Sequence, residues 1–115
     1  MNKKPIGINY IMGSVTTFTQ KYPSFNVMYL DPDTLIPVEY ETYSFDLDAA
    51  NKIALIDNGK TPPKWELKYK YTETFGMKDL SPESFLKFAN NMLIDDHSAR
   101  LYRNHRYIDH ICGTT

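Results

Sequence analysis

The feature that most constrains the fold is a change in the spacing of apolar residues near residue 48. Before that point apolar and polar residues alternate, which is typical of strands that bury one face. The alternating stretches are Ile6–Met12, Ser24–Leu30 and Pro37–Leu47, and "DPD" at 31–33 predicts the turn between the last two. After residue 48 the spacing becomes helical. The sequence therefore predicts an α+β fold, with three or so β-strands followed by helices.

The first strong helical signal lies in "DLSPESFLKFANNML", residues 79–93. Ser81 is the predicted N-cap, because its hydroxyl can accept a free backbone N–H, and Pro82 suits the first helical position. Leu80 is placed to pack back onto Phe85. The apolar stripe predicted to be buried consists of Phe85, Phe88, Ala89 and Met92.

The second helical signal, "DDHSARLYRNHRYIDHI" at 95–111, contains the three histidines. His105 and Asp109 are spaced to share a helical face and could hold a metal, but His110 points elsewhere. His105 lies on the apolar stripe with Leu101 and Ile108, so we expect a hydrogen-bonded core histidine or a helix C-terminal cation. His97 follows two aspartates near a helix start, which favours a capping region. The residues therefore predict no metal site.

The stretch "KWELKYKYTETFG", residues 64–76, fits two structures. From Trp65 to Tyr71 apolar and charged residues alternate, as in a strand with one charged face. Trp65 and Tyr69 are also four residues apart, which places a pair on one helical face. Periodicity alone leaves both structures open.

Composition excludes several classes of protein. The 115 residues carry 13 basic and 14 acidic side chains, so no net field favours a polyanion and no nucleic-acid partner is expected. No apolar run approaches the roughly 20 residues that cross a bilayer, which predicts no transmembrane segment. The start of the chain has no apolar stretch long enough for a signal peptide, so the chain taken by itself is expected to be soluble and not exported. The single cysteine, Cys112, excludes an internal disulfide and a cysteine-based zinc site.

Two further motifs are better explained by structure than by chemistry. "ALIDNGKT" at 54–61 fits a loose phosphate-binding loop, but Pro62 and Pro63 remove the N–H donors that would open its helix, so we expect an Asn-Gly turn. Glu39, Glu41 and Glu73 have no partner at a fixed spacing and are expected on a solvated strand face or at a helix end. The residues by themselves predict no self-contained active site.

Four blocks of the sequence resemble a known family. Residues 5–18 ("PIGINYIMGSVTTF"), 22–31, 40–51 ("YETYSFDLDAAN") and 62–84 are similar, in order and spacing, to the C-terminal portion of acid sphingomyelinase and the acid sphingomyelinase-like phosphodiesterases. The resemblance implies part of a secreted or lysosomal, zinc-dependent hydrolase with a calcineurin-like metallophosphoesterase core. Residues 1–47 would be the terminal strands of that core sheet and 48–115 a helical C-terminal subdomain.

The resemblance also implies roles for particular residues. Thr16, Thr17 and Phe18 would lie near the substrate, with Phe18 replacing a tyrosine that is usual in the family. Residues 64–76 would form a helix in which Trp65, Tyr69 and Phe75 pack the subdomain against the core. Asn26 stands where the family commonly has arginine, and Cys112 lacks its usual partners.

The family's zinc ligands, which include a Gly-His-x-His motif, lie upstream, and this sequence contains no such motif. The resemblance therefore implies no catalytic residue, no metal ligand and no cofactor within this chain.

Three functional hypotheses remain. The first is a C-terminal fragment of an acid sphingomyelinase-like phosphodiesterase, inactive alone, whose partner is the upstream metallophosphoesterase half. The second is a lipid- or protein-binding module that uses exposed apolar surface. The third is a small independent enzyme using Asp and His residues. The substrate stays open between sphingomyelin and nucleotide phosphodiesters.

Overall fold

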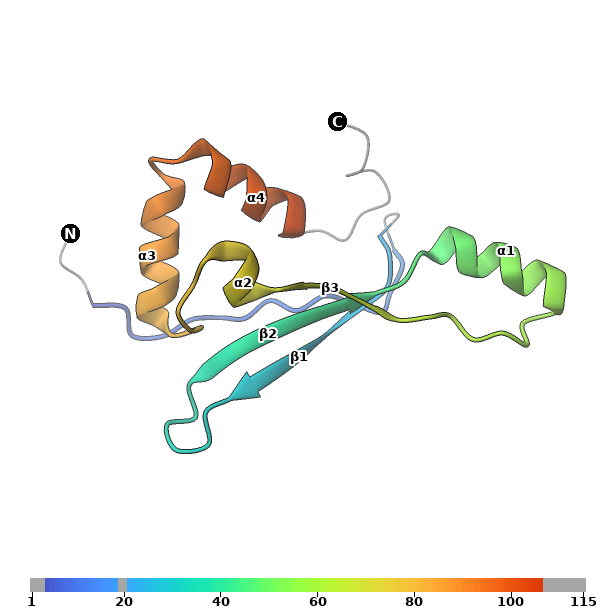
Figure 1. The fold of residues 1–115 in the computed structure, drawn as a ribbon, viewed down its shortest axis with the longest axis horizontal. Coiled ribbons are helices and arrows are strands. Elements are labelled where there is room, and N and C mark those ends of the chain that lie inside the picture. The colour runs from blue at the N-terminus through green and yellow to red at the C-terminus, as the bar shows by residue number, and fades with distance from the viewer. Residues whose placement is uncertain (1–3, 19–20, 107–115) are drawn as a thin grey trace.

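The computed structural model describes residues 4–18 and 21–106. Three antiparallel strands form one sheet in the order β1-β2-β3, and helices follow, so the α+β class is confirmed (Figure 1). The elements are β1 (Ser24–Leu30), β2 (Pro37–Ser44), α1 (Leu47–Asp57), β3 (Glu66–Lys70), α2 (Tyr71–Phe75), α3 (Pro82–Met92) and α4 (Asp96–Arg106).

The hairpin of β1 and β2 confirms two predicted strands and the turn between them. The strands pair from Ser24 opposite Ser44 to Tyr29 opposite Glu39. In the turn the Asp31 carboxylate accepts the backbone N–H groups of Asp33 and Thr34, at 3.0 and 2.8 Å. Such aspartate turns stabilise the reversal of the chain locally, which explains why the sequence predicts it well.

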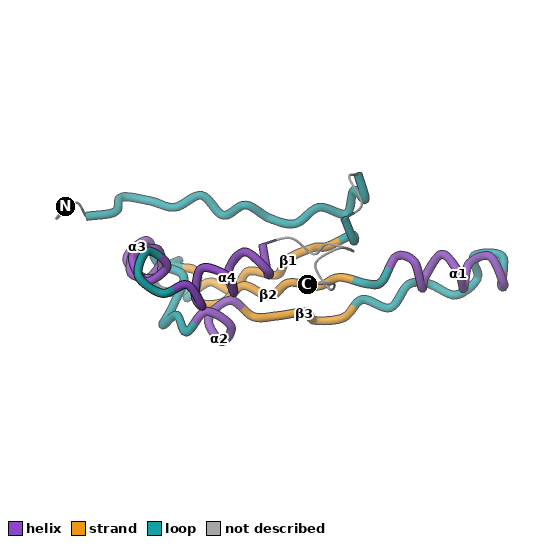
Figure 2. Tube along the Cα trace, turned by 90° about the horizontal axis from the view of Figure 1, so that it is seen from above, coloured by secondary structure: helices purple, strands orange, loops and turns teal. Residues whose placement is uncertain are grey.

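The predicted strand at Ile6–Met12 is wrong. This segment runs alongside the sheet without strand structure (Figure 2). It is held by its side chains instead: the Tyr10 ring packs edge-on against Phe85 at 5.9 Å, and its hydroxyl donates to the Leu80 carbonyl. Alternation reports which residues share a face, but a strand also needs a neighbouring backbone with which to pair.

The third strand is β3, and the helix expected over residues 64–76 is therefore wrong for 66–70. Glu41 pairs with Lys70 and Thr42 with Tyr69 across β2 and β3, so the alternating spacing was the correct signal. Only Tyr71–Phe75 is helical, and this turn ends at Gly76, whose φ of 62° is readily adopted by glycine. Backbone pairing with β2 outweighs the four-residue spacing of the aromatic side chains.

The core lies where α2, α3 and α4 meet one face of the sheet. Its buried apolar residues are Tyr40, Phe75, Met77, Leu80 and Phe88. The predicted cap of α3 is confirmed, because the Ser81 hydroxyl accepts the N–H of Ser84 at 3.3 Å. The stripe predicted along α3 is buried only in part: Ala89 is exposed and Phe85 half-buried.

Helix α1 was not predicted as an element and lies apart from the core, at one end of the sheet (Figure 1). Asp46 caps it by accepting the N–H of Ala49, and none of its residues is buried. It ends in the expected turn, with Asn58 and Gly59 at φ of 59° and 74°. The Asp57 carboxylate accepts the backbone N–H groups of Gly59, Lys60 and Thr61. In a phosphate-binding loop these N–H groups would instead point toward the phosphate.

Candidate functional site

The main groove of the described chain, about 560 Å³, lies between the N-terminal segment, the helix-covered face of the sheet and α4. Its lining residues are Ile11, Met12, Gly13, Ser14, Thr16, Lys21, Tyr22, Ser24, Asn26, Tyr40, Thr42, Tyr69, Tyr71, Tyr102, His105 and Arg106. The groove thus joins parts of the chain about 90 residues apart in sequence.

Asn26 holds the N-terminal wall of this groove against the sheet. Its side-chain oxygen accepts the N–H of Gly13 at 2.9 Å, and its amide donates to the Thr42 hydroxyl at 2.7 Å. Beside it, the Ser24 N–H donates to the Ser14 carbonyl at 2.9 Å. The sequence marked Asn26 only as a departure from arginine, and its positioning role depends on a contact that no local pattern reveals.

His105 forms part of the opposite wall. Its Nδ1 lies 2.8 Å from the Leu101 carbonyl, and its ring contacts the Tyr69 ring at 4.9 Å. The Tyr69 hydroxyl donates to the His105 carbonyl at 3.0 Å. The prediction of a hydrogen-bonded histidine is confirmed, although the side chain is half-buried rather than in the core.

Three tyrosines supply the floor of the groove. Burial raises the pKa of Tyr40 to about 12 and also raises the pKa values of Tyr69 and Tyr71. These phenols are therefore neutral at physiological pH and can donate hydrogen bonds but not act as bases. The buried Tyr40 hydroxyl has no hydrogen-bond partner among the described residues.

The residues expected near substrate are only partly in this groove. Thr16 lines it, whereas Thr17 is exposed and Phe18 is 79% exposed on the same segment. Their closeness to a substrate stays a prediction.

The described residues contain no cluster of three or more His, Cys, Asp or Glu side chains that could hold a metal ion. Asp109, His110 and Cys112, together with Ile108, lie outside the part of the chain that the structure describes. The geometry thus provides a groove of mixed polar and aromatic residues, whose described lining includes the basic residues Lys21 and Arg106 and no Asp or Glu.

Comparison with known proteins identifies the family. Residues 8–111 match the model of the acid sphingomyelin phosphodiesterase C-terminal region. The chain belongs to this family. The chain is 36% identical to sphingomyelin phosphodiesterase B of Dictyostelium discoideum over 94 residues, and 31% identical to sphingomyelin phosphodiesterase 1 of Caenorhabditis elegans over 97 residues.

These matches cover 76% and 84% of this chain but only 14% and 16% of the two relatives. Sphingomyelin phosphodiesterase A of Dictyostelium discoideum is 33% identical over 88 residues, which again cover 76% of this chain and 14% of the relative. The chain thus spans about a seventh of the length of the curated relatives it matches. None of its described helices has the length and apolarity needed to cross a membrane.

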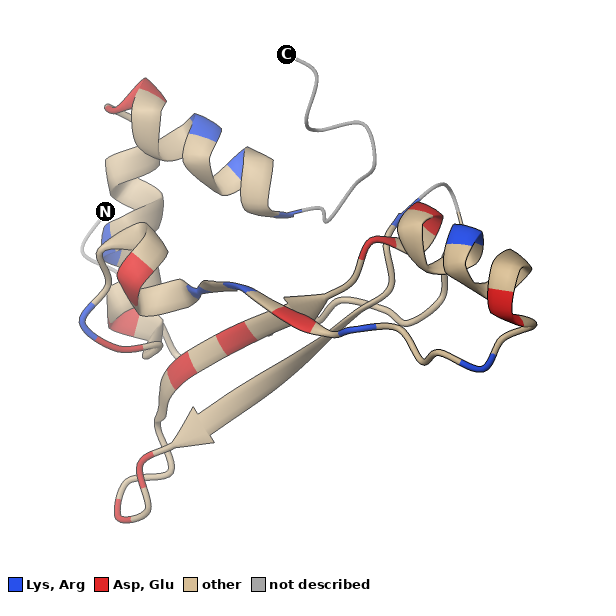
Figure 3. Cartoon of the chain, turned by 45° about the vertical axis from the view of Figure 1, so that its right-hand side comes forward, with Lys and Arg blue, Asp and Glu red and all other residues tan. Residues whose placement is uncertain are grey.

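Glu41 has a structural role, and its expected position on a solvated strand face is wrong. Glu41 is 7% exposed and accepts hydrogen bonds from the hydroxyls of Tyr43 at 2.8 Å and Tyr29 at 3.1 Å. The bond from Tyr43, with help from Tyr29 and Lys70, lowers the pKa of Glu41. Figure 3 shows the acidic positions of β2 beside the basic positions of β3, where the Lys70 Nζ lies 3.6 Å from Glu41.

Glu39 is likewise engaged within the fold. It accepts the N–H of Thr72 at 3.1 Å and the hydroxyl of the same residue, which ties β2 to the start of α2. Two carboxylates that were expected on a solvated strand face or at a helix end therefore make contacts within the fold, and Glu39 joins the sheet to α2.

Proposed function

We propose that this chain is the non-catalytic C-terminal portion of an acid sphingomyelinase-like phosphodiesterase and is inactive alone. The observation that carries the proposal is the family match over residues 8–111, in a chain that corresponds to only 14–20% of each curated relative. The relatives are named sphingomyelin phosphodiesterases, so the proposed reaction of the whole protein is hydrolysis of the phosphodiester of sphingomyelin. Nucleotide phosphodiesters are the alternative substrates.

Zinc is the proposed cofactor of the whole protein, and the described residues do not fit it. A two-metal phosphodiester site needs several convergent carboxylate, amide or imidazole ligands. The described residues offer no such group, and the Nδ1 of His105 already faces the Leu101 carbonyl. We therefore assign zinc binding and activation of water to the upstream metallophosphoesterase half.

Within the whole enzyme, this chain would supply the end of the core sheet and the helical subdomain packed on it. The segment with Thr16, Thr17 and Phe18 would approach the substrate, where Phe18 offers an apolar surface and no hydroxyl. The proposed location is extracellular or lysosomal, as the family resemblance implies.

A second candidate is a lipid- or protein-binding module without catalysis. It is favoured by the many large apolar side chains that this chain exposes, among them Ile11 and Phe18 on the N-terminal segment and Leu55 and Ile56 on α1.

The two functions are separated by reconstitution. Residues 8–111 are grafted in place of the matching region of sphingomyelin phosphodiesterase B, and hydrolysis of sphingomyelin and of bis(p-nitrophenyl) phosphate is measured at acidic pH with zinc. We expect the chimera to turn over and the 115-residue chain alone to show no zinc-dependent turnover.

The control for the chain alone is His105→Ala together with His110→Ala. Zinc-dependent turnover by the chain that this control abolishes would contradict the proposal and make the helix with His105 an active site. A folded but inactive chimera, combined with binding of the chain to sphingomyelin vesicles, would favour the binding module.

A further inference from the structure

Both sides of the sheet carry apolar residues, but only the side with Met28, Tyr40 and Tyr69 is covered by the described helices and the N-terminal segment. The side chains beneath the helices and the N-terminal segment include Ser24, Thr42 and Ser44, all of which are buried. The opposite side chains of β1 and β2 include Phe25, Val27 and Tyr29, of which Phe25 and Tyr29 are exposed. An antiparallel sheet with one solvated side ordinarily presents polar residues to water, so the exposed aromatic residues of the second side are unusual.

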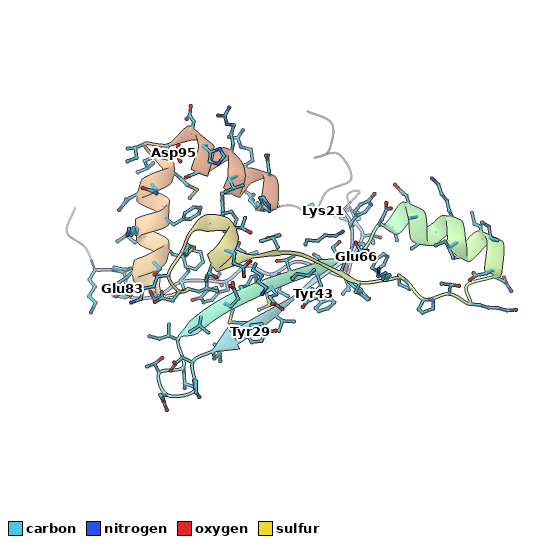
Figure 4. All side chains as sticks on the ribbon, viewed as in Figure 1. Lys21, Tyr29, Tyr43, Glu66, Glu83 and Asp95 are labelled. Carbon is cyan, nitrogen blue, oxygen red and sulfur yellow. The ribbon has the colours of Figure 1, made fainter. Side chains whose placement is uncertain are left out.

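We define the open face by the residues Phe25, Val27, Tyr29, Tyr43, Trp65 and Leu67. Figure 1 shows α2, α3 and α4 on the other side of the sheet, and Figure 4 shows Tyr29 and Tyr43 pointing away from these helices. The open face is therefore not covered by any described helix.

Aromatic rings form a preorganised cluster at one end of the open face. The Phe25 and Tyr43 rings stack with centroids 5.1 Å apart and planes 5° apart. Trp65 meets Phe25 edge-on at 4.9 Å and Phe45 at 4.6 Å. Rings that already support one another lose little conformational freedom when a partner covers them, which is the property of a binding surface.

Charged side chains also lie on the open face, where Glu41 is opposite Val27 on one neighbouring strand and Lys70 on the other. Glu41 is hydrogen-bonded by Tyr29 and Tyr43 and lies 3.6 Å from the Lys70 ammonium. Lys70 in turn lies 3.5 Å from Glu73. A protein that covers this face would therefore meet Glu41 already hydrogen-bonded and paired with a cation, which reduces the electrostatic penalty of docking.

We propose that the open face is the docking surface for the remainder of the phosphodiesterase, the portion that precedes the C-terminal region. This inference rests on the proposed function and names the surface that joins the two parts. The relatives carry at least 80% of their length outside the matched region, which is ample to cover a three-stranded sheet. The partner surface is predominantly apolar, as the aromatic cluster requires.

The test uses two leucines that are exposed to nearly the same extent. Leu67 on the open face is 44% exposed, and Leu86 on α3 is 40% exposed. Leu67→Lys and Leu86→Lys are introduced into the 115-residue chain and into the chimera with sphingomyelin phosphodiesterase B. In the chain alone both should melt within about 2 °C of each other, because neither side chain is buried.

In the chimera we expect Leu67→Lys to melt at least about 5 °C below Leu86→Lys, because only the former places a charge in an interface. Hydroxyl-radical oxidation provides a readout without mutation. Oxidation of Tyr29 and Trp65 should be slower in the chimera than in the 115-residue chain alone by about fivefold or more, since interface cores exclude water. Oxidation of Leu93 should proceed at the same rate in both.

Equal melting of the two substituted chimeras, or unchanged oxidation of Tyr29 and Trp65, would overturn the docking surface. Neither readout depends on hydrolysis, so an active chimera with an unprotected open face would overturn this inference and leave the proposed function standing. A second copy of the chain would be the occupant if both the 115-residue chain and the chimera form dimers and Leu67→Lys abolishes both dimers. That result would also overturn the proposed docking surface.

Discussion

At the scale of single residues, hydrogen bonds from polar side chains fix where the helix α3 begins. Asp79 is one such residue, because one of its oxygens accepts hydrogen bonds from the hydroxyls of Ser81 and Ser84, both at 2.6 Å. Ser81 also accepts the N–H of Ser84, so the start of α3 is held from both sides. Capping follows from residue type and local order, which is why the sequence predicted this cap correctly.

Ser81→Ala should lower the free energy of unfolding by about 1 kcal/mol, because α3 loses the acceptor for a free N–H at its first turn. Urea denaturation followed by circular dichroism gives the change. Lys87→Ala, at an exposed position of the same helix, is the control and should stay within about 0.5 kcal/mol of the original chain. Equal denaturation midpoints for the two variants would show that the cap contributes nothing.

The residues singled out for packing differ in what surrounds them. Phe75 is buried in the core, whereas Trp65 and Tyr69 are half-buried on opposite sides of the sheet. The family resemblance implied that all three are packing residues. It could not tell which face of the sheet each would reach, because that follows from the pairing of β3 with β2.

At the scale of elements, the N-terminal segment is attached to the sheet by few contacts. Gly13 makes the closest of these, and a Cβ built on it would lie 2.1 Å from the Ser24 hydroxyl and 3.1 Å from the Ser24 Cβ. Gly7, in the same segment, has no atom within 4 Å of such a Cβ. The two glycines therefore provide a matched pair for testing how the segment is held.

Gly13→Ala should displace the segment from Asn26 and reduce stability by about 1–3 kcal/mol, the usual cost of overpacking. Thermal unfolding measures the loss, and limited proteolysis should cut residues 4–18 faster. Gly7→Ala should change neither quantity measurably. If both variants resist protease equally, the contact between Gly13 and Ser24 does not hold the segment in solution.

At the scale of the whole molecule, hydrogen bonds lower the pKa values of carboxyl groups throughout the chain. For Asp79 and Asp95 the main donors are the hydroxyls of Ser81 and Ser98, and for Glu41 the hydroxyl of Tyr43. Each carboxyl is more acidic folded than unfolded, so its contribution to stability is present above its unfolded pKa. That contribution is lost as the pH falls through the folded pKa.

The free energy of unfolding should therefore be nearly constant above about pH 5 and fall steadily below about pH 4. Asp79→Asn should make the fall shallower, because one of the linked carboxyls no longer titrates. Urea midpoints measured across this range provide the test, with Glu83→Gln at an exposed position of α3 as the control. A slope for Asp79→Asn identical to that of the control would contradict the linkage.

Local signals in the sequence determined β1, β2, the turn between them and the start of α3, because each depends on residues close together in the chain. Tertiary structure decided the rest. Glu66–Lys70 became the third strand in place of Ile6–Met12, because strand formation requires a paired backbone as well as alternation. Alternation likewise placed Phe25 and Tyr29 on one face, but only the packing of the helices decided that this apolar face would stay open.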